Sequence, residues 1–96
     1  MSKFKRLRAH KGSTLKFEIP LSPLRLNSFR RVVRAEIKKN DGAPVARFQT
    51  AYDAMNITCV LNPTDTIRLS GQYKYEIGCE DMNGIHTVQY GVLEVL

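Results

Sequence analysis

The sequence predicts an all-β domain, an antiparallel sandwich or barrel of about seven short strands with one short helical turn. In residues 71–80, every second residue from Tyr73 to Cys79 is apolar or aromatic, and the residues between them are polar or glycine. Residues 85–95 form a second run that is rich in β-branched and aromatic residues. The pair Asn83-Gly84 between them is typical of a tight turn, so these runs predict a long C-terminal hairpin.

A glycine interrupts the second run of this hairpin. Gly91 stands where the neighbouring positions carry large side chains. A glycine inside a strand marks a bulge or a place where another backbone comes close. We therefore expect one of these two features at Gly91.

Shorter runs of the same kind supply the other predicted strands. Residues 14–19 alternate, with their three large apolar side chains directed inward, and residues 56–61 are a further strand. Residues 20–29 contain two prolines, which remove donors from a strand ladder, so we expect a loop there that crosses between sheets.

Residues 30–39 admit two interpretations. Their Arg, Ala, Glu and Lys residues favour a helix. The alternation from Val33 to Ile37 favours a strand, and the Asn40-Asp41-Gly42 sequence that follows is typical of a hairpin turn. We predict a strand, with residues 44–52 as its single antiparallel partner.

One short helical turn is expected between the strands. Asn62 is a suitable N-cap, and Pro63 fits the first helical position because its missing N–H would have no partner there. Ile67 and Leu69 are expected to pack down against the core. Such a turn often covers the open end of a sandwich.

Length and composition indicate one domain. A chain of 96 residues suits a single core, with residues 1–11 as a basic arm or edge strand and residues 12–96 as the sandwich domain. No apolar run approaches the roughly 20 residues that a membrane span needs. The basic N-terminus has no apolar signal core behind it, so we expect neither secretion nor membrane insertion.

The residues that usually carry chemistry are few. Cys59 and Cys79 lie in predicted strands, which indicates two buried free thiols, although a disulfide between neighbouring strands stays open. His10 and His86 have no ligand-like spacing to the cysteines. We expect no enzymatic activity, no cofactor and no metal site.

Charge divides the chain into two halves. Residues 1–39 hold twelve of the fifteen Lys and Arg residues and only two acids, and residues 40–96 hold three cations and seven acids. The halves therefore carry +10 and −4, which sum to +6. This asymmetry indicates a polyanion or an acidic protein surface as the partner, or head-to-tail contact between copies. The predicted partner-binding residues are Lys3, Arg6, Arg8, Arg30, Arg31 and Arg34.

Several short motifs resemble one family. Gly12-Ser13-Thr14 precedes the first alternating strand, residues 66–77 carry Thr, Leu, Gly, Tyr, Tyr and Ile in order, and the last strand contains Gly91-Val92-Leu93-Glu94-Val95. This pattern resembles the short immunoglobulin-like modules of tailed-phage virion proteins, such as the N-terminal domain of baseplate upper proteins. Ser13 stands where that pattern has an aspartate, and the segment at Arg30 is unusually basic.

The resemblance implies an immunoglobulin-like β-sandwich and a non-enzymatic structural role in a bacteriophage particle. It implies a capsid decoration or auxiliary protein, or a small tail or baseplate component, present in many copies. The implied partners are shell or tail proteins and further copies of the chain, with assembly in the host cytoplasm, rather than a membrane or nucleic acid.

Nucleic acid is the rival partner. The cations of residues 30–39 beside Phe29 could form a basic strip next to an aromatic ring, as on a small nucleic-acid-binding β-barrel. Against this alternative, the aromatic residues Phe17, Phe48 and Tyr75 occupy positions that alternate as core positions do.

Overall fold

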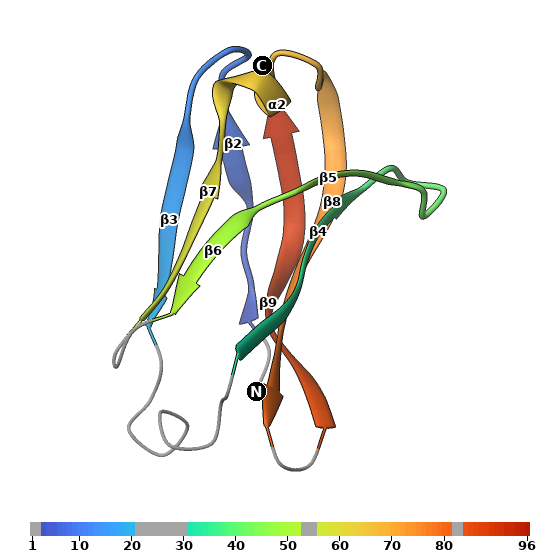
Figure 1. Ribbon diagram of the computed structural model, residues 1–96. Coiled ribbons are helices and arrows are strands. Elements are labelled where there is room, and N and C mark those ends of the chain that lie inside the picture. The colour runs from blue at the N-terminus through green and yellow to red at the C-terminus, as the bar shows by residue number, and fades with distance from the viewer. Residues whose placement is uncertain (1–2, 21–30, 53–55, 82–83) are drawn as a thin grey trace.

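Nine strands and one helical turn make up the described part of the computed structural model, which comprises residues 3–20, 31–52, 56–81 and 84–96 (Figure 1). The elements are β1 (Lys3–Phe4), β2 (Leu7–Ala9), β3 (Leu15–Pro20), β4 (Arg31–Lys38), β5 (Pro44–Arg47), β6 (Gln49–Tyr52), β7 (Asn56–Leu61), α2 (Pro63–Thr66), β8 (Gly71–Asp81) and β9 (Gly84–Val95). No described helix is long and apolar enough to cross a membrane.

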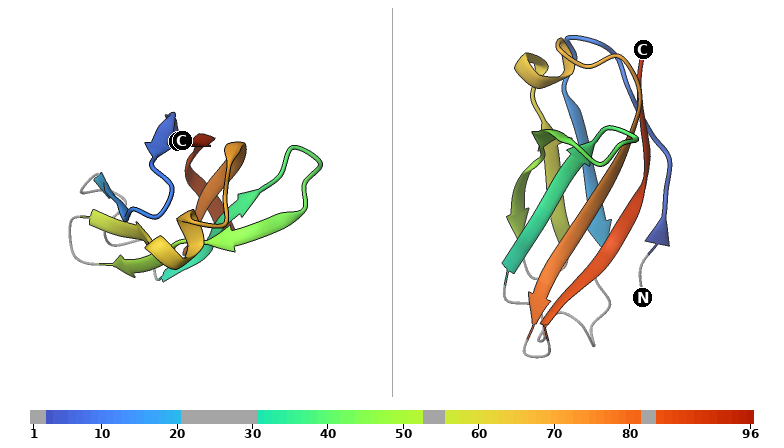
Figure 2. Two further views of the ribbon diagram at one scale, coloured as in Figure 1. Left: turned by 90° about the horizontal axis from the view of Figure 1, so that it is seen from above. Right: turned by 90° about the vertical axis from the view of Figure 1, so that its right-hand side faces the viewer.

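The strands form two layers. One sheet has the order β1-β9-β8-β4-β5, with β2 also paired to β9, and the other has the order β3-β7-β6. The view from above in Figure 2 shows the two layers edge-on. In immunoglobulin nomenclature β3, β7 and β6 correspond to strands B, E and D, and β9, β8, β4 and β5 correspond to strands G, F, C and C′. These strand orders are those of the immunoglobulin sandwich, so the predicted fold class is confirmed.

A tyrosine at the start of β8 adds a detail of that fold. The backbone N–H of Ser70 donates a 2.9 Å hydrogen bond to the hydroxyl of Tyr73. Immunoglobulin-like sandwiches have a tyrosine at this corner whose hydroxyl bonds to backbone a few residues upstream. The bond fixes the point at which the chain leaves α2 and enters β8.

The predicted C-terminal hairpin is confirmed. β8 and β9 pair antiparallel from Gly71↔Val95 to Asp81↔Gly84. The register shifts between Ile77 and Gly78, so the irregularity lies away from Gly91. Residues 82–83, which hold half of the predicted turn, lie outside the described residues.

The strand interpretation of residues 30–39 is also confirmed, because β4 pairs with both β8 and β5. β3 and β4 belong to different sheets, so the chain changes sheet between residues 20 and 31. The crossing loop was predicted at residues 20–29, but Pro20 is the last residue of β3, opposite Asn56, where a proline at the strand end removes only a terminal donor. Residues 21–29 lie outside the described residues.

The single partner strand predicted for residues 44–52 is wrong. The segment divides at Phe48 into β5, which pairs with β4, and β6, which pairs with β7 in the other sheet. Phe48 is buried, and its N–H donates to the carbonyl of Ala35 at 2.9 Å. Placing this ring in the core turns the chain from one sheet to the other.

Three aromatic rings form the centre of the core. Phe17 of β3, Phe48 and Tyr75 of β8 meet edge to face, with ring centroids 5.3–6.3 Å apart. Cys59 and Cys79 are fully buried and free, as predicted. The rings join the two sheets where antibody domains have a disulfide between strands B and F.

The helical turn forms where it was predicted, with Asn62 at the N-cap and Pro63 first in the helix. The expectation that Ile67 packs inward is wrong, because 56% of this residue is exposed. Thr66 is buried instead, and its hydroxyl donates to the carbonyl of Ser13 at 2.8 Å. The short helix places this hydroxyl over the end of the sandwich, while Leu69 packs into the core as expected.

Candidate docking surface at the N-terminal edge

The N-terminal residues form the outermost strands of the larger sheet. β1 and β2 both pair in parallel with β9, with Phe4 opposite Tyr90 and Leu7 opposite Leu93. Leu7 and Ala9 are buried, whereas Lys3, Phe4 and the residues between the two strands are exposed. The segment is therefore an edge strand that covers part of the core and presents its cations to solvent.

The backbone of Lys5 holds this edge in place. Its N–H donates to the carbonyl of Tyr90 at 2.9 Å, and its carbonyl accepts a 2.7 Å hydrogen bond from the hydroxyl of Tyr75. The side-chain amide of Gln89 donates to the same hydroxyl at 3.0 Å. Burial raises the pKa of the Tyr75 phenol, so it stays protonated and able to donate.

Gly91 makes this contact possible. A Cβ at residue 91 would overlap the Lys5 carbonyl oxygen and lie 2.9 Å from the carbonyl carbon. The close backbone approach expected at Gly91 is thus confirmed, and the approaching backbone is that of the N-terminal segment.

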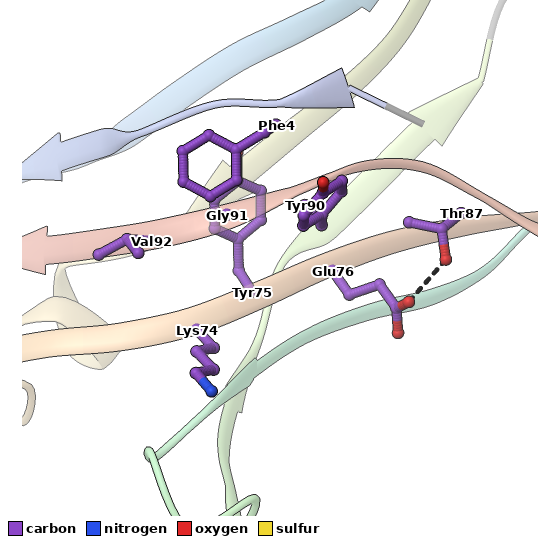
Figure 3. Close-up of a pocket in the computed structure, with 8 residues that line it drawn as sticks. All are labelled: Phe4, Lys74, Tyr75, Glu76, Thr87, Tyr90, Gly91 and Val92. Carbon is purple, nitrogen blue, oxygen red and sulfur yellow. Dashed lines mark hydrogen bonds between the residues drawn. The ribbon is translucent and has the colours of Figure 1, made fainter. Parts of the chain in front are cut away.

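A shallow groove lies on the outer face of the sheet beside this edge. It has a volume of about 540 Å³. Figure 3 shows Phe4 of β1 on one side of β9, and Lys74 and Glu76 of β8 on the other. The rings of Phe4 and Tyr90 meet edge to face with their centroids 5.5 Å apart, and the two residues are 53% and 42% exposed. The groove is lined by Phe4, Lys74, Tyr75, Glu76, Thr87, Tyr90, Gly91 and Val92.

The carboxylate in the groove is already engaged. Glu76 accepts hydrogen bonds from the hydroxyl of Thr87 at 2.6 Å and from the guanidinium of Arg34 at 3.1 Å. The Thr87 bond, and then the Arg34 contact, lower the pKa of Glu76 below its ordinary value of 4.5 despite partial burial. Within the described residues Lys74 makes no ion pair, so of the two charged groups in the groove its ammonium is the one without an ionic partner.

The lowered pKa of Glu76 predicts a pH-dependent contribution to stability. The folded state binds the proton of Glu76 less well than the unfolded state, so this stabilisation is present above about pH 4.5 and is lost as the pH falls through the folded-state pKa. We expect Glu76→Gln to lower the free energy of unfolding at pH 7 by about 1 kcal/mol, because about a third of the side chain is exposed to screening solvent.

Urea unfolding at pH 7 and at pH 3 tests this expectation. The difference between Glu76→Gln and the original chain should shrink at pH 3. Glu18→Gln, at an exposed position of β3, is the matched control. If the two chains differ in free energy of unfolding by the same amount at both pH values, the charge of the Glu76 carboxylate does not stabilise the fold.

The predicted partner-binding cations fall into two groups. Lys3, Arg6 and Arg8 lie along the β1–β2 edge. Arg31 and Arg34 lie on β4, which β9 and β8 separate from that edge. Arg30 lies outside the described residues. The structure therefore brings together the N-terminal three and does not bring the β4 residues beside them.

Some of the predicted cations also have partners within the chain. Arg8 pairs with Glu94 at 3.3 Å, and Arg34 pairs with Glu76 and, at 3.9 Å, with Glu36. Two of these pairs, Arg8–Glu94 and Arg34–Glu76, join a cation of the first half to an acid of the second half, so the charge separation along the sequence is partly neutralised in the fold. In the described part of the chain, Lys3 and Arg6 make no ion pair, which leaves them available to a partner.

Sequence reasoning missed the groove itself. The period-two pattern of residues 73–79 predicted only that Lys74 lies on the outer face of its strand. It gave no sign that Phe4 would lie beside Tyr90, because parallel pairing between the two ends of the chain leaves no local signature.

Other chemical groups do not add to this surface. Among the described residues, no group of three or more His, Cys, Asp or Glu side chains is arranged to hold a metal ion. Burial raises the pKa of Cys59 to about 12, with the nearby Cys79 adding to the shift, and raises that of Cys79 to about 11. Both thiols are therefore protonated and poorly nucleophilic at neutral pH.

No family model matches the sequence, and no curated protein matches it. The candidate surface therefore depends on its geometry alone.

Proposed function

We propose that this protein is a non-enzymatic structural component of a bacteriophage particle that attaches to other virion proteins in many copies. It is a capsid decoration or auxiliary protein, or a small component of the tail or baseplate. Its partner is an acidic surface of a shell or tail protein, or of a neighbouring copy.

The N-terminal edge is the observation that most supports this proposal. Lys3 and Arg6 are exposed and unpaired among the described residues, and they lie next to the exposed Phe4 and Tyr90. A rigid edge that combines cations with aromatic rings suits attachment to an acidic protein surface. Many weak contacts of this kind become firm when copies bind side by side on one particle.

The composition of the particle tests the proposal. Particles purified from the phage that encodes this chain, analysed by quantitative mass spectrometry, are expected to contain the protein at a fixed ratio to the major shell or tail protein. A high ratio indicates a shell location and a low fixed ratio a tail location. Absence of the protein from purified particles, with the protein present in infected cells, would contradict the proposal.

The nucleic-acid alternative makes a different prediction. The Phe4–Tyr90 pair lies near unpaired cations, as on surfaces that bind single strands by stacking and charge. Under the attachment proposal, binding to single-stranded DNA is weak at physiological salt. Submicromolar affinity with a steep dependence on salt would favour nucleic acid instead.

A further inference from the structure

The groove beside the N-terminal edge has the features of a site for a short segment of a partner protein. Its two sides differ: Phe4 of β1 with Tyr90 and Val92 of β9 make one side apolar, and Lys74 and Glu76 of the neighbouring strand β8 make the other side charged (Figure 3). A smaller hollow continues past Lys74 to Lys38 of β4, with a volume of about 70 Å³. An extended segment could therefore lie across three strands.

We propose that this groove binds an extended acidic segment of a partner protein, with an aromatic or large aliphatic side chain against Phe4 and Tyr90 and a carboxylate against Lys74. The inference rests on the proposed attachment role and adds the chemistry of the segment that docks. The partner is a protein other than a second copy of this chain.

Charge complementarity selects this occupant. Of the groove's two charged side chains, Glu76 is held by Thr87 and Arg34, so a cationic segment would find no free carboxylate there. Lys74 makes no ion pair within the described residues. A segment that brings a carboxylate beside its apolar side chain would therefore find one unpaired cation, Lys74, in the groove.

The geometry also explains why the groove exists in the free protein. The Lys5 carbonyl is fixed by the Tyr75 hydroxyl and by the space above Gly91. This contact holds Phe4 on the outer face, where its ring meets Tyr90. The apolar wall of Phe4 and Tyr90 is therefore already ordered in the free protein, which reduces the conformational entropy lost on binding.

Titration of the isotopically labelled full chain with short capped peptides tests the proposal. The probe is an Asp-Phe-Glu peptide, and the two comparison peptides replace Phe with Ala or both acids with Lys. We expect the Asp-Phe-Glu peptide to shift the amide resonances of Lys74, Thr87 and Val92 at roughly millimolar to submillimolar concentration, as suits so small a ligand. The resonances of Lys16 and Thr50 on the other sheet should stay in place.

Matched variants localise the binding. Lys74→Glu is expected to weaken the binding of the Asp-Phe-Glu peptide about 3- to 10-fold. Lys16→Glu, the same charge change on β3, should leave the binding unchanged. Phe4→Ala is expected to weaken the binding of this peptide by a similar factor. Ile67→Ala, which removes another exposed apolar side chain, is its control.

Several results would overturn the proposal. These are no shift at the groove, equal binding of the Ala peptide, or equal effects of Lys74→Glu and Lys16→Glu. Tighter binding of a single-stranded oligonucleotide at the same residues would assign the groove to nucleic acid. Self-association that Phe4→Ala abolishes would assign it to a second copy.

The two proposals can fail separately. If Phe4→Ala and Lys74→Glu leave attachment to particles unchanged, the groove proposal is wrong and the attachment role stands. If the peptide binds as expected and the protein is absent from particles, the groove stands and the attachment role is wrong.

Discussion

Replacing Gly91 with alanine is expected to detach the N-terminal segment from β9 and to lower the free energy of unfolding by about 2–4 kcal/mol. The new Cβ would overlap the Lys5 carbonyl, which must then leave its hydrogen bond with Tyr75. Residue 91 also has φ +156°, which side chains rarely adopt, so strain adds to the clash. Urea unfolding gives the stability, and hydrogen exchange of the Lys5 amide reports the detachment.

Gly71→Ala is the matched control for this substitution. Gly71 also has positive φ, at +90°, but a Cβ there would have no atom within 4 Å. We expect a cost of about 1–2 kcal/mol from backbone strain alone, with the Lys5 amide still protected. If both variants lose the same stability and keep the Lys5 amide protected, Gly91 is not needed for the contact with the N-terminal segment.

Replacing Tyr75 with alanine is expected to cost about 3–5 kcal/mol. The ring is almost fully buried and contacts the rings of Phe17 and Phe48, so its removal leaves a cavity between the sheets. Tyr90→Ala is the matched control, because Tyr90 is partly exposed and should cost about 1 kcal/mol. A near-zero loss for Tyr75→Ala in urea unfolding would contradict its place in the core.

Tyr75→Phe separates the ring from its hydroxyl. It keeps the aromatic packing but leaves the carbonyl of Lys5 and the amide of Gln89 without their shared partner. The expected cost is about 1–3 kcal/mol, with faster exchange concentrated in residues 3–9. Exchange that rises equally throughout the sheet would argue against a specific role in holding the edge.

Local patterns predicted most of the fold, because period-two alternation depends on neighbours in the sequence. The hairpin of β8 and β9, strand β4 and the turn at Pro63 were all visible in this way. The division at Phe48 was not, because residues 44–52 read as one strand and only the position of a core ring decides where the chain changes sheet. The sequence predicted Ile67 as the buried residue of the helical turn, but Thr66 is buried instead, because one short turn can direct either residue inward.

The candidate site was predicted only in part. The charge of the N-terminal segment was evident from the sequence, but its parallel pairing with β9 depends on contacts between the two ends of the chain. By its charge alone Arg34 was an equal candidate for binding a partner, but its position on β4 places it against Glu76. Strand order and register decide which cations have no ion-pair partner, and composition predicts neither.

The N-terminal segment is better tested by substitution than by deletion. Deleting residues 2–8 would remove the buried Leu7 and uncover the edge of β9, so a loss of attachment could reflect a damaged fold. Substitution of the exposed Lys3 and Arg6 avoids this problem because neither side chain is buried.

Attachment of a charge-reversed edge to particles that lack the protein is the most direct test of the central claim, docking through the N-terminal edge. The double variant Lys3→Glu/Arg6→Glu is compared by cosedimentation with Lys11→Glu/Lys16→Glu, which changes the net charge equally at exposed positions away from the groove. We expect the edge variant to attach at least about tenfold more weakly at low salt, with a smaller difference at high salt, and the control to attach normally. Equal attachment of the two variants at low salt would contradict docking through this edge.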